Sequence, residues 1–296
     1  MKQNSSLVLA AIAAIFAFNT AANAQSLQTY FNFTTYGTVA ANSTIVDATG
    51  NTHATLNNDS ITTLTGAGLT LTSAGGGNSR NNGLVFASGS LAGFTSSFTI
   101  QDWVTTTGSG GSVLFGGNTA NGGNNYCGDG FTGVSTLIGF TWGGLTSGGG
   151  AGNATSTGYS QWGQTGGLGY SLVNGSLSDI VLSYDASTYT FSEYVNGVLK
   201  GTQVNDFSIN SLASVANFAI AGCPQEPWND GSAGATTSDF LLYNGALSQS
   251  QVTALDSLGA GASPSSIVAV VPEPGSMALM ALGGTGFLLW RRRQAK

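Results

Sequence analysis

The sequence predicts an all-β sandwich between two processing segments, and three observations lead to this fold class. Between residues 25 and 271 no long segment has helical periodicity, whereas short apolar runs separated by turn residues recur throughout. Asn196-Gly197 lies between two alternating segments, and this pair is typical of a two-residue hairpin turn. Because 41% of the 296 residues are hydrophobic and 10% aromatic, the chain can bury a core, which argues against wholesale disorder.

Residues 1–24 are typical of a secretory signal. Lys2 supplies the positive start, Leu7 to Phe18 form an apolar stretch, and Ala22-Asn23-Ala24 is a small-x-small cleavage site before Gln25. A short buried helix is the alternative interpretation. We expect signal peptidase to remove this segment after export across the inner membrane.

The next elements are strands, followed by one helix. In the hairpin from Tyr189 to Lys200, alternation places Tyr189, Phe191, Glu193 and Val195 on one face, opposite Thr190, Ser192 and Tyr194. Ser248 can cap a short helix with Gln251 three residues on, and Val252, Leu255 and Leu258 form its apolar stripe. The other expected strands are Tyr30–Phe33, Leu69–Leu71, Phe98–Ile100 and Ile180–Tyr184.

The last segment, residues 272–296, combines three features. Pro272-Glu273-Pro274 precedes an uncharged run over 275–290, and Arg291-Arg292-Arg293 follows it. The order resembles the PEP-CTERM sorting tail of Gram-negative bacteria. That resemblance implies a single transmembrane sorting helix with its arginines in the cytoplasm. It also implies cleavage by an exosortase near Pro-Glu-Pro and a cell-surface or extracellular product. A plain membrane anchor is the alternative.

Several segments between these ends resemble a LamG-like, concanavalin A-like jelly roll. They are Asp47-Ala48-Thr49-Gly50-Asn51, Phe98 to Val104 with an inward tryptophan at Trp103, the Ser183 to Val198 hairpin region, and Asp239 to Asn244. The resemblance implies one jelly-roll domain over residues 25–260, with 261–271 as a linker. It also implies a calcium ion held by carboxylates and carbonyls, for which Asp47 and Asp239 are the candidate ligands. Asp129, beside Cys127 in a glycine-rich loop, is a third candidate. The alternative for each is an aspartate that caps a turn or increases solubility.

The segment from Gly108 to Gly169 holds 22 glycines in 62 residues, interleaved with aromatic side chains. These aromatics either stack on sugar rings from ligand-facing loops or fill the sandwich core. Cys127 and Cys223 are an even pair in an exported chain, so we expect a disulfide; a catalytic thiol is the alternative.

Charge and residue usage exclude several functions. Residues 25–271 carry twelve acidic and two basic side chains, a net charge of −10, which excludes nucleic acid as a partner. His53 is the only histidine, so a zinc site built from several histidines is excluded, and a histidine-dependent triad has only this one residue to draw on. Outside the tail the only glutamates are Glu193 and Glu226, and neither has an acidic residue within three positions.

We therefore expect a non-catalytic surface or matrix protein that binds extracellular polysaccharide or another matrix component. A passive structural role is the alternative. A glycoside hydrolase, which needs two facing carboxyl groups, is third.

Overall fold

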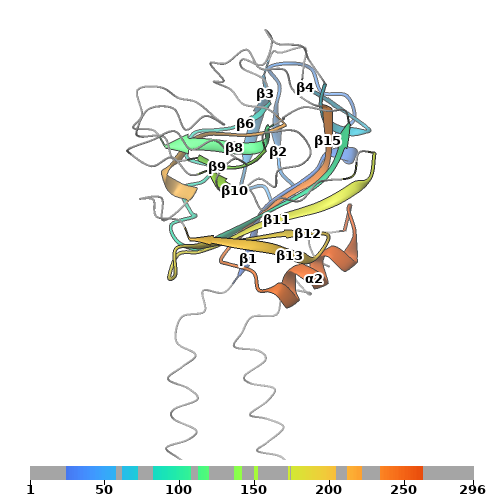
Figure 1. The fold of residues 1–296 in the computed structure, drawn as a ribbon. Helices are drawn as coiled ribbons and strands as arrows, with labels where there is room; N and C mark the ends of the chain where they lie inside the picture. The colour runs from blue at the N-terminus through green and yellow to red at the C-terminus, as the bar shows by residue number, and fades with distance from the viewer. Residues whose placement is uncertain are drawn as a thin grey trace, which may run out of the picture.

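Two antiparallel sheets pack face to face, and a single helix covers the outer face of the larger one (Figure 1). The computed structural model describes residues 25–57, 62–72, 83–107, 113–119, 137–141, 150–152, 173, 175–204, 212–221 and 234–262. This architecture confirms the predicted all-β sandwich. Residues 1–24 and 263–296 lie outside the described part, and so do the expected signal and sorting tail.

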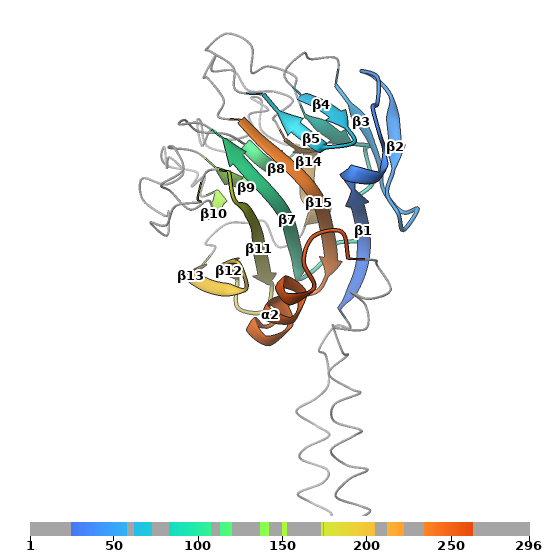
Figure 2. The ribbon, with the colours of Figure 1, turned by 90° about the vertical axis from the view of Figure 1, so that its right-hand side faces the viewer.

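The larger sheet has eight strands in the order β13-β12-β11-β7-β15-β5-β4, with β1 also paired to β15. Their bounds are β1 Ser26–Asn32, β4 Thr62–Thr65, β5 Gly68–Leu71, β7 Phe98–Thr107, β11 Leu177–Asp185, β12 Thr190–Val195, β13 Val198–Val204 and β15 Gly234–Asn244. The long strands β7 and β15 lie side by side at its centre (Figure 2).

The smaller sheet has seven strands in the order β10-β9-β8-β14-β6-β3-β2. Their bounds are β2 Thr44–Val46, β3 His53–Leu56, β6 Leu84–Phe86, β8 Val113–Thr119, β9 Leu137–Thr141, β10 Gly150–Gly152 and β14 Val215–Ile220. Short 3-10 turns lie at Phe33–Thr35 and Leu212–Ser214.

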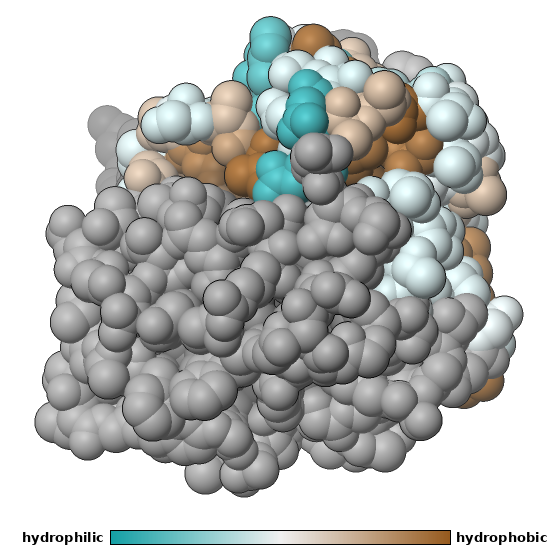
Figure 3. Space-filling model, turned by 90° about the horizontal axis from the view of Figure 1, so that it is seen from above, coloured by the Kyte–Doolittle hydropathy of each residue, from teal (hydrophilic) through white to brown (hydrophobic). Residues whose placement is uncertain are grey.

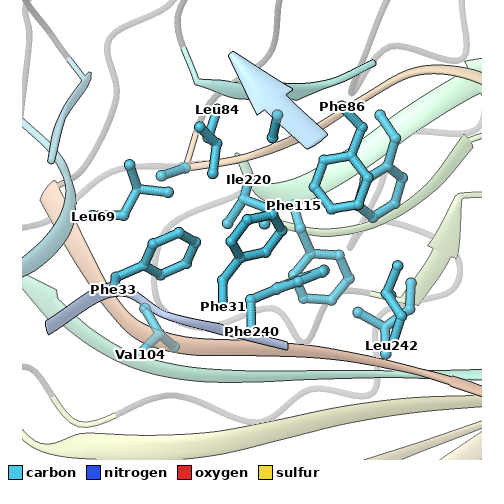
Figure 4. Close-up of a cluster of buried hydrophobic side chains, with 14 of the residues drawn as sticks. Phe31, Phe33, Leu69, Leu84, Phe86, Val104, Phe115, Ile220, Phe240 and Leu242 are labelled. Carbon is cyan, nitrogen blue, oxygen red and sulfur yellow. The ribbon is translucent and has the colours of Figure 1, made fainter. Parts of the chain in front are cut away.

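The core between the sheets is rich in aromatic rings (Figure 4). Phe86 packs edge-on against Phe240 and also contacts Phe31 and Phe218, with ring centroids 5.1–6.1 Å apart. Such fully buried rings contribute about 1.5–3 kcal/mol each through removal of apolar surface from water. The interior is therefore a packed core rather than a ligand cavity over the described strands.

A second apolar cluster lies on the opposite face of the larger sheet, under α2 (Gln249–Leu258). Val252 and Leu255 of the helix pack there with Trp103 of β7. The expected inward position of Trp103 is wrong, because Ile100 and Val104 on the same strand fill the core between the sheets and Trp103 faces α2. Because both faces of β7 are buried, the alternation of side chains along the strand could not show which face Trp103 occupies.

The predicted hairpin is confirmed, with β12 joined to β13 by Asn196 and Gly197 at φ values of 50° and 69°. Positive φ at both turn residues is what the two-residue connection requires. Tyr189 was expected in the first strand, but it lies in the preceding turn with φ 54° and is half-exposed. Phe191 is instead the first residue of this hairpin whose side chain packs into the core between the sheets.

The helix cap is also confirmed. The Ser248 side chain accepts from the Gln251 backbone N–H, and the Gln251 side chain accepts from the Ser248 N–H at 2.9 Å. Gln25, before β1, donates to the Ala246 carbonyl at 2.7 Å and accepts from the Gln251 side chain. The beginning of the described chain is thus held beside the start of α2.

Candidate functional site

The Asp47 turn closes the free edge of β1. The Asp47 carboxylate accepts the backbone N–H groups of Tyr30 at 2.9 Å, Thr49 at 3.0 Å and Thr52 at 2.7 Å. In return, the Tyr30 carbonyl accepts the Ala48 N–H at 2.7 Å. Hydrogen bonds to a charged acceptor are stronger than neutral ones, so the side chain ties the turn to the edge strand.

Asp239 belongs to a different cluster, on the outer face of the larger sheet. It accepts the Gly261 N–H at 2.8 Å and lies 3.1 Å from the Tyr30 hydroxyl, which also lies 2.7 Å from the Ala262 carbonyl. Burial raises the pKa of Asp239, although the bonds from Gly261 and Tyr30 oppose the rise. A tyrosine has one hydroxyl hydrogen, so a protonated Asp239 that donates to Tyr30 would satisfy both contacts.

The sequence named Asp47, Asp239 and Asp129 as possible calcium ligands. Asp47 contacts the backbone of Tyr30 and Asp239 contacts its hydroxyl, so the tyrosine lies between the two carboxylates. Over the described ranges there is no group of three or more His, Cys, Asp or Glu side chains that could share a metal ion. Asp129 lies outside those ranges, and calcium binding stays a prediction.

Two further buried carboxyl groups were not found from the sequence. Asp179 of β11 accepts from the Gln101 side chain at 3.0 Å on the outer face, and its second oxygen has no partner among the described residues. Burial raises the pKa of Asp179 to about 8, with Asp256 of α2 adding to the rise. The carboxyl group is therefore mostly protonated at neutral pH.

Asp102 of β7 is buried on the other face, between the sheets. Asp102 lies on the same face of β7 as Ile100 and Val104, which both belong to the core between the sheets. Its side chain is 0% exposed. Burial raises the pKa of Asp102 well above its ordinary value, while the nearby Thr237 side chain acts against the rise. An acid in the middle of an apolar strand run is the signal that would have identified it.

A hollow lies beside the outer-face acids, lined by Tyr30, Gln101, Trp103 and Asp239 together with residues from the end of α2. Each of these four side chains is at most 9% exposed, so the hollow offers little side-chain surface to a large ligand. Its geometry does not fit a polysaccharide chain.

Tyr243 and Tyr30 provide a matched pair for testing the outer face. The Tyr243 hydroxyl is buried and has no hydrogen-bond partner among the described residues, whereas the Tyr30 hydroxyl has two acceptors within reach. We expect Tyr30→Phe to lower the free energy of unfolding by about 1–2 kcal/mol. Tyr243→Phe should leave it unchanged or raise it slightly, as urea unfolding of residues 25–271 would measure. A larger loss from Tyr243→Phe would contradict this assignment.

Five of the seven described carboxyl side chains are buried, and only Asp185 at the end of β11 and Asp256 of α2 are partly exposed. Asp102, Asp179, Glu193 and Asp239 are each at most 2% exposed, and Asp47 is 4% exposed. Asp102 and Asp239 come from neighbouring strands but lie on opposite faces of the sheet. This arrangement over the described strands does not form the pair of facing, accessible carboxyls that glycoside hydrolysis uses.

Strands β2 and β3 expose side chains on the outer face of the smaller sheet. Val46 is 42% exposed and pairs with exposed His53, while the Thr44 and Thr55 hydroxyls lie 3.0 Å apart. The smaller sheet lies on the side away from α2 (Figure 1). The view from above shows hydrophilic and hydrophobic residues intermixed where the surface is coloured (Figure 3).

Several expected residues lie outside the described part of the chain. They include the sorting residues Pro272, Glu273, Pro274, Arg291, Arg292 and Arg293, and both Cys127 and Cys223. The expected disulfide and sorting helix therefore stay predictions from sequence. Within the described residues no helix is long and apolar enough to cross a membrane.

The sandwich and its terminal helix define the concanavalin A-like class of β proteins. Residues 76–253 match the family model of the concanavalin A-like lectin/glucanases superfamily, and residues 270–293 match the PEP-CTERM protein-sorting motif. The chain belongs to the concanavalin A-like superfamily. The sorting motif marks it as an exported protein that is processed by exosortase, with a cell-surface or extracellular location.

Solved structures agree with the fold. Trypanosoma rangeli sialidase in complex with 2-keto-3-deoxy-D-glycero-D-galacto-2,3-difluoro-nononic acid matches with a TM-score of 0.53 and 19% identity, over 78% of this chain and 32% of that one. The same organism's sialidase in complex with sialic acid matches with a TM-score of 0.53 and 18% identity, over the same shares. The chain thus spans about a third of these sialidases. A search of curated proteins found no match.

Proposed function

We propose that the exported domain binds extracellular glycan or another matrix component and does not catalyse a reaction. The observation that carries this proposal is the position of the described carboxyl groups: five are buried, and the two partly exposed ones, Asp185 and Asp256, come from different elements, the end of β11 and α2. Family membership supports a carbohydrate partner, since the superfamily includes lectins as well as glucanases.

The proposed binding surface is the outer face of β2 and β3. The sorting motif follows Ala262 in the chain, and Ala262 contacts Tyr30 on the α2 side of the larger sheet, so the smaller sheet is the side further from that point (Figure 1). His53 and Val46 offer flat apolar surface beside paired threonine hydroxyls. Sugar rings present the matching combination of C–H faces and hydroxyl groups.

The test is binding of residues 25–271 to the exopolysaccharide of the bacterium that makes the protein, with calcium and with chelator. We expect saturable binding, no release of shortened product, and an affinity that falls about threefold or more in His53→Ala, equivalent to about 0.7 kcal/mol. Tyr189→Ala, at an exposed turn of the larger sheet, is the control and should bind normally.

Each other outcome points to a different function. Absence of binding in both buffers would overturn the proposal for that polymer and favour a passive structural role. Turnover of the polysaccharide would establish a hydrolase. Loss of binding with chelator alone would support calcium and would make Asp47, Asp239 and Asp129 the positions to substitute.

A further inference from the structure

The turn between β12 and β13 lies against α2 (Figure 1). Two side chains of the helix donate to the carbonyl group of Gly197 in this turn, the Gln249 amide at 2.6 Å and the Thr253 hydroxyl at 3.1 Å. A Cβ atom added at Gly197 would lie 3.1–3.3 Å from the side chain of Asp256, so the helix leaves almost no space over the turn. These contacts hold the turn and the helix together.

The turn consists of a dipeptide that is prone to spontaneous deamidation. Because glycine has no Cβ atom, the backbone nitrogen of Gly197 is open to attack the side-chain amide of Asn196, which is exposed to solvent. A bond forms between the Gly197 nitrogen and Cγ of Asn196, the bond from Cγ to the side-chain nitrogen breaks, and ammonia leaves with the proton of the Gly197 amide. Water then opens the resulting succinimide to aspartate or isoaspartate.

The native hydrogen bonds oppose this reaction. The Asn196 side-chain oxygen accepts the Asp179 N–H at 2.9 Å, and the Asn196 N–H donates to the Asp179 carbonyl at 2.8 Å. Ring closure brings Cγ of Asn196 onto the Gly197 nitrogen, so the side chain must leave Asp179 and the turn must rotate against the two donors from α2. The reaction therefore starts from a locally opened state in which α2 has separated from the turn.

We propose that Asn196 is a site of spontaneous deamidation, and that the contact between α2 and the β12–β13 turn sets its rate. Water is the only co-reactant, so the reaction continues after the protein has been exported. Isoaspartate adds a carbon atom to the backbone and no longer fits a two-residue turn. The inference is independent of glycan binding.

Asn244-Gly245 provides an internal comparison. The described part of the chain holds two Asn-Gly pairs, and in this second pair the Gly245 nitrogen itself donates to the Ser97 carbonyl at 2.8 Å. Asn244 is the last residue of β15 and pairs with Phe98 of β7. The attacking nitrogen is thus held by the sheet rather than by α2, and we expect no conversion at Asn244.

The experiment incubates the processed protein, purified from the host that exports it, at neutral pH. Peptide mapping follows the gain in mass that results when the amide NH₂ of Asn196 is replaced by OH. In Gln249→Ala/Thr253→Ala, which removes both donors to Gly197, we expect conversion to be about tenfold faster than in the unsubstituted protein. Ser257→Ala is the control in the same helix and should leave the rate unchanged, because the Ser257 hydroxyl bonds to the Ala254 carbonyl within α2.

Asn196→Gly checks the site itself. Glycine also adopts the positive φ of the turn but carries no amide, so the gain in mass should disappear from this peptide. Equal rates in the unsubstituted protein and the double variant would overturn the proposal, because α2 would then not control the reaction. Conversion of Asn244 in parallel with Asn196 would also overturn it, since the domain would then be opening as a whole. Absence of conversion at Asn196 in both proteins would exclude the site.

Discussion

Replacing Asp47 with alanine is expected to lower the free energy of unfolding by about 3–5 kcal/mol, one of the largest effects of a single substitution here. The carboxylate accepts three backbone N–H groups, and the substitution leaves those of Tyr30 and Thr52 without an acceptor at a buried position. It also detaches the turn that closes the edge of β1. Urea unfolding of residues 25–271 measures the effect.

Asp185→Ala is the matched control for this prediction. Asp185 also accepts from a turn, through the Ser187 backbone and side chain, but it is only partly buried and lies at the end of β11. We expect a loss of about 1 kcal/mol or less. If Asp47→Ala costs stability only in the presence of calcium, and chelator brings the unsubstituted protein to the same level, Asp47 is a calcium ligand rather than a turn anchor.

The second large effect is the pH dependence set by Asp179. Its pKa is about 8 in the folded state because of burial, against about 3.9 in an unfolded chain. Between these values the folded state keeps a proton that the unfolded state has lost, so the free energy of unfolding falls as pH rises from about 4 to 8. The upper bound for this one group is about 6 kcal/mol.

Asp179→Asn should flatten this slope and stabilise the protein at neutral pH. The amide carbonyl can still accept from Gln101, and no charge is left to bury. Urea unfolding at several pH values compares the two slopes. Asp185→Asn is the control. Hydrogen bonds from Ser187 and Thr188 lower the pKa of Asp185 despite its partial burial, so Asp185 contributes a pH dependence of the free energy of unfolding with the opposite sign. A slope in Asp179→Asn equal to that of the unsubstituted protein would contradict the assignment.

Local patterns predicted the elements whose formation depends on neighbours in sequence. The Asn196-Gly197 turn and the Ser248–Gln251 cap need only a few adjacent residues, and both form as expected. The face of Trp103 could not be predicted in the same way, because α2 buries a face that would otherwise be exposed. The resemblance indicated the strand correctly but placed its tryptophan on the wrong face.

The candidate site was less predictable than the fold. The Asp47 turn was recognised as a motif, but its bond to Tyr30 depends on where β1 lies across the sheet. Asp102 and Asp179 were missed, because acids in strand sequences ordinarily face water. For Asp102 the apolar residues on its own strand were a signal of burial that the alternation argument did not use. Tyr30 was expected only as a strand residue, and its contact with Ala262 joins positions 232 residues apart.

The pairing of β1 with β15 has a consequence for when the protein can fold. The first strand of the domain pairs with the last one, as in Phe31 opposite Phe240, and β15 also completes the centre of the sheet beside β7. Contacts this distant in sequence form slowly, because a long loop must close before they contribute stability. The larger sheet therefore cannot assemble until nearly the whole domain has emerged from the export channel. The sorting motif follows β15 and α2 in the chain, so the larger sheet can be completed only shortly before that motif is exported.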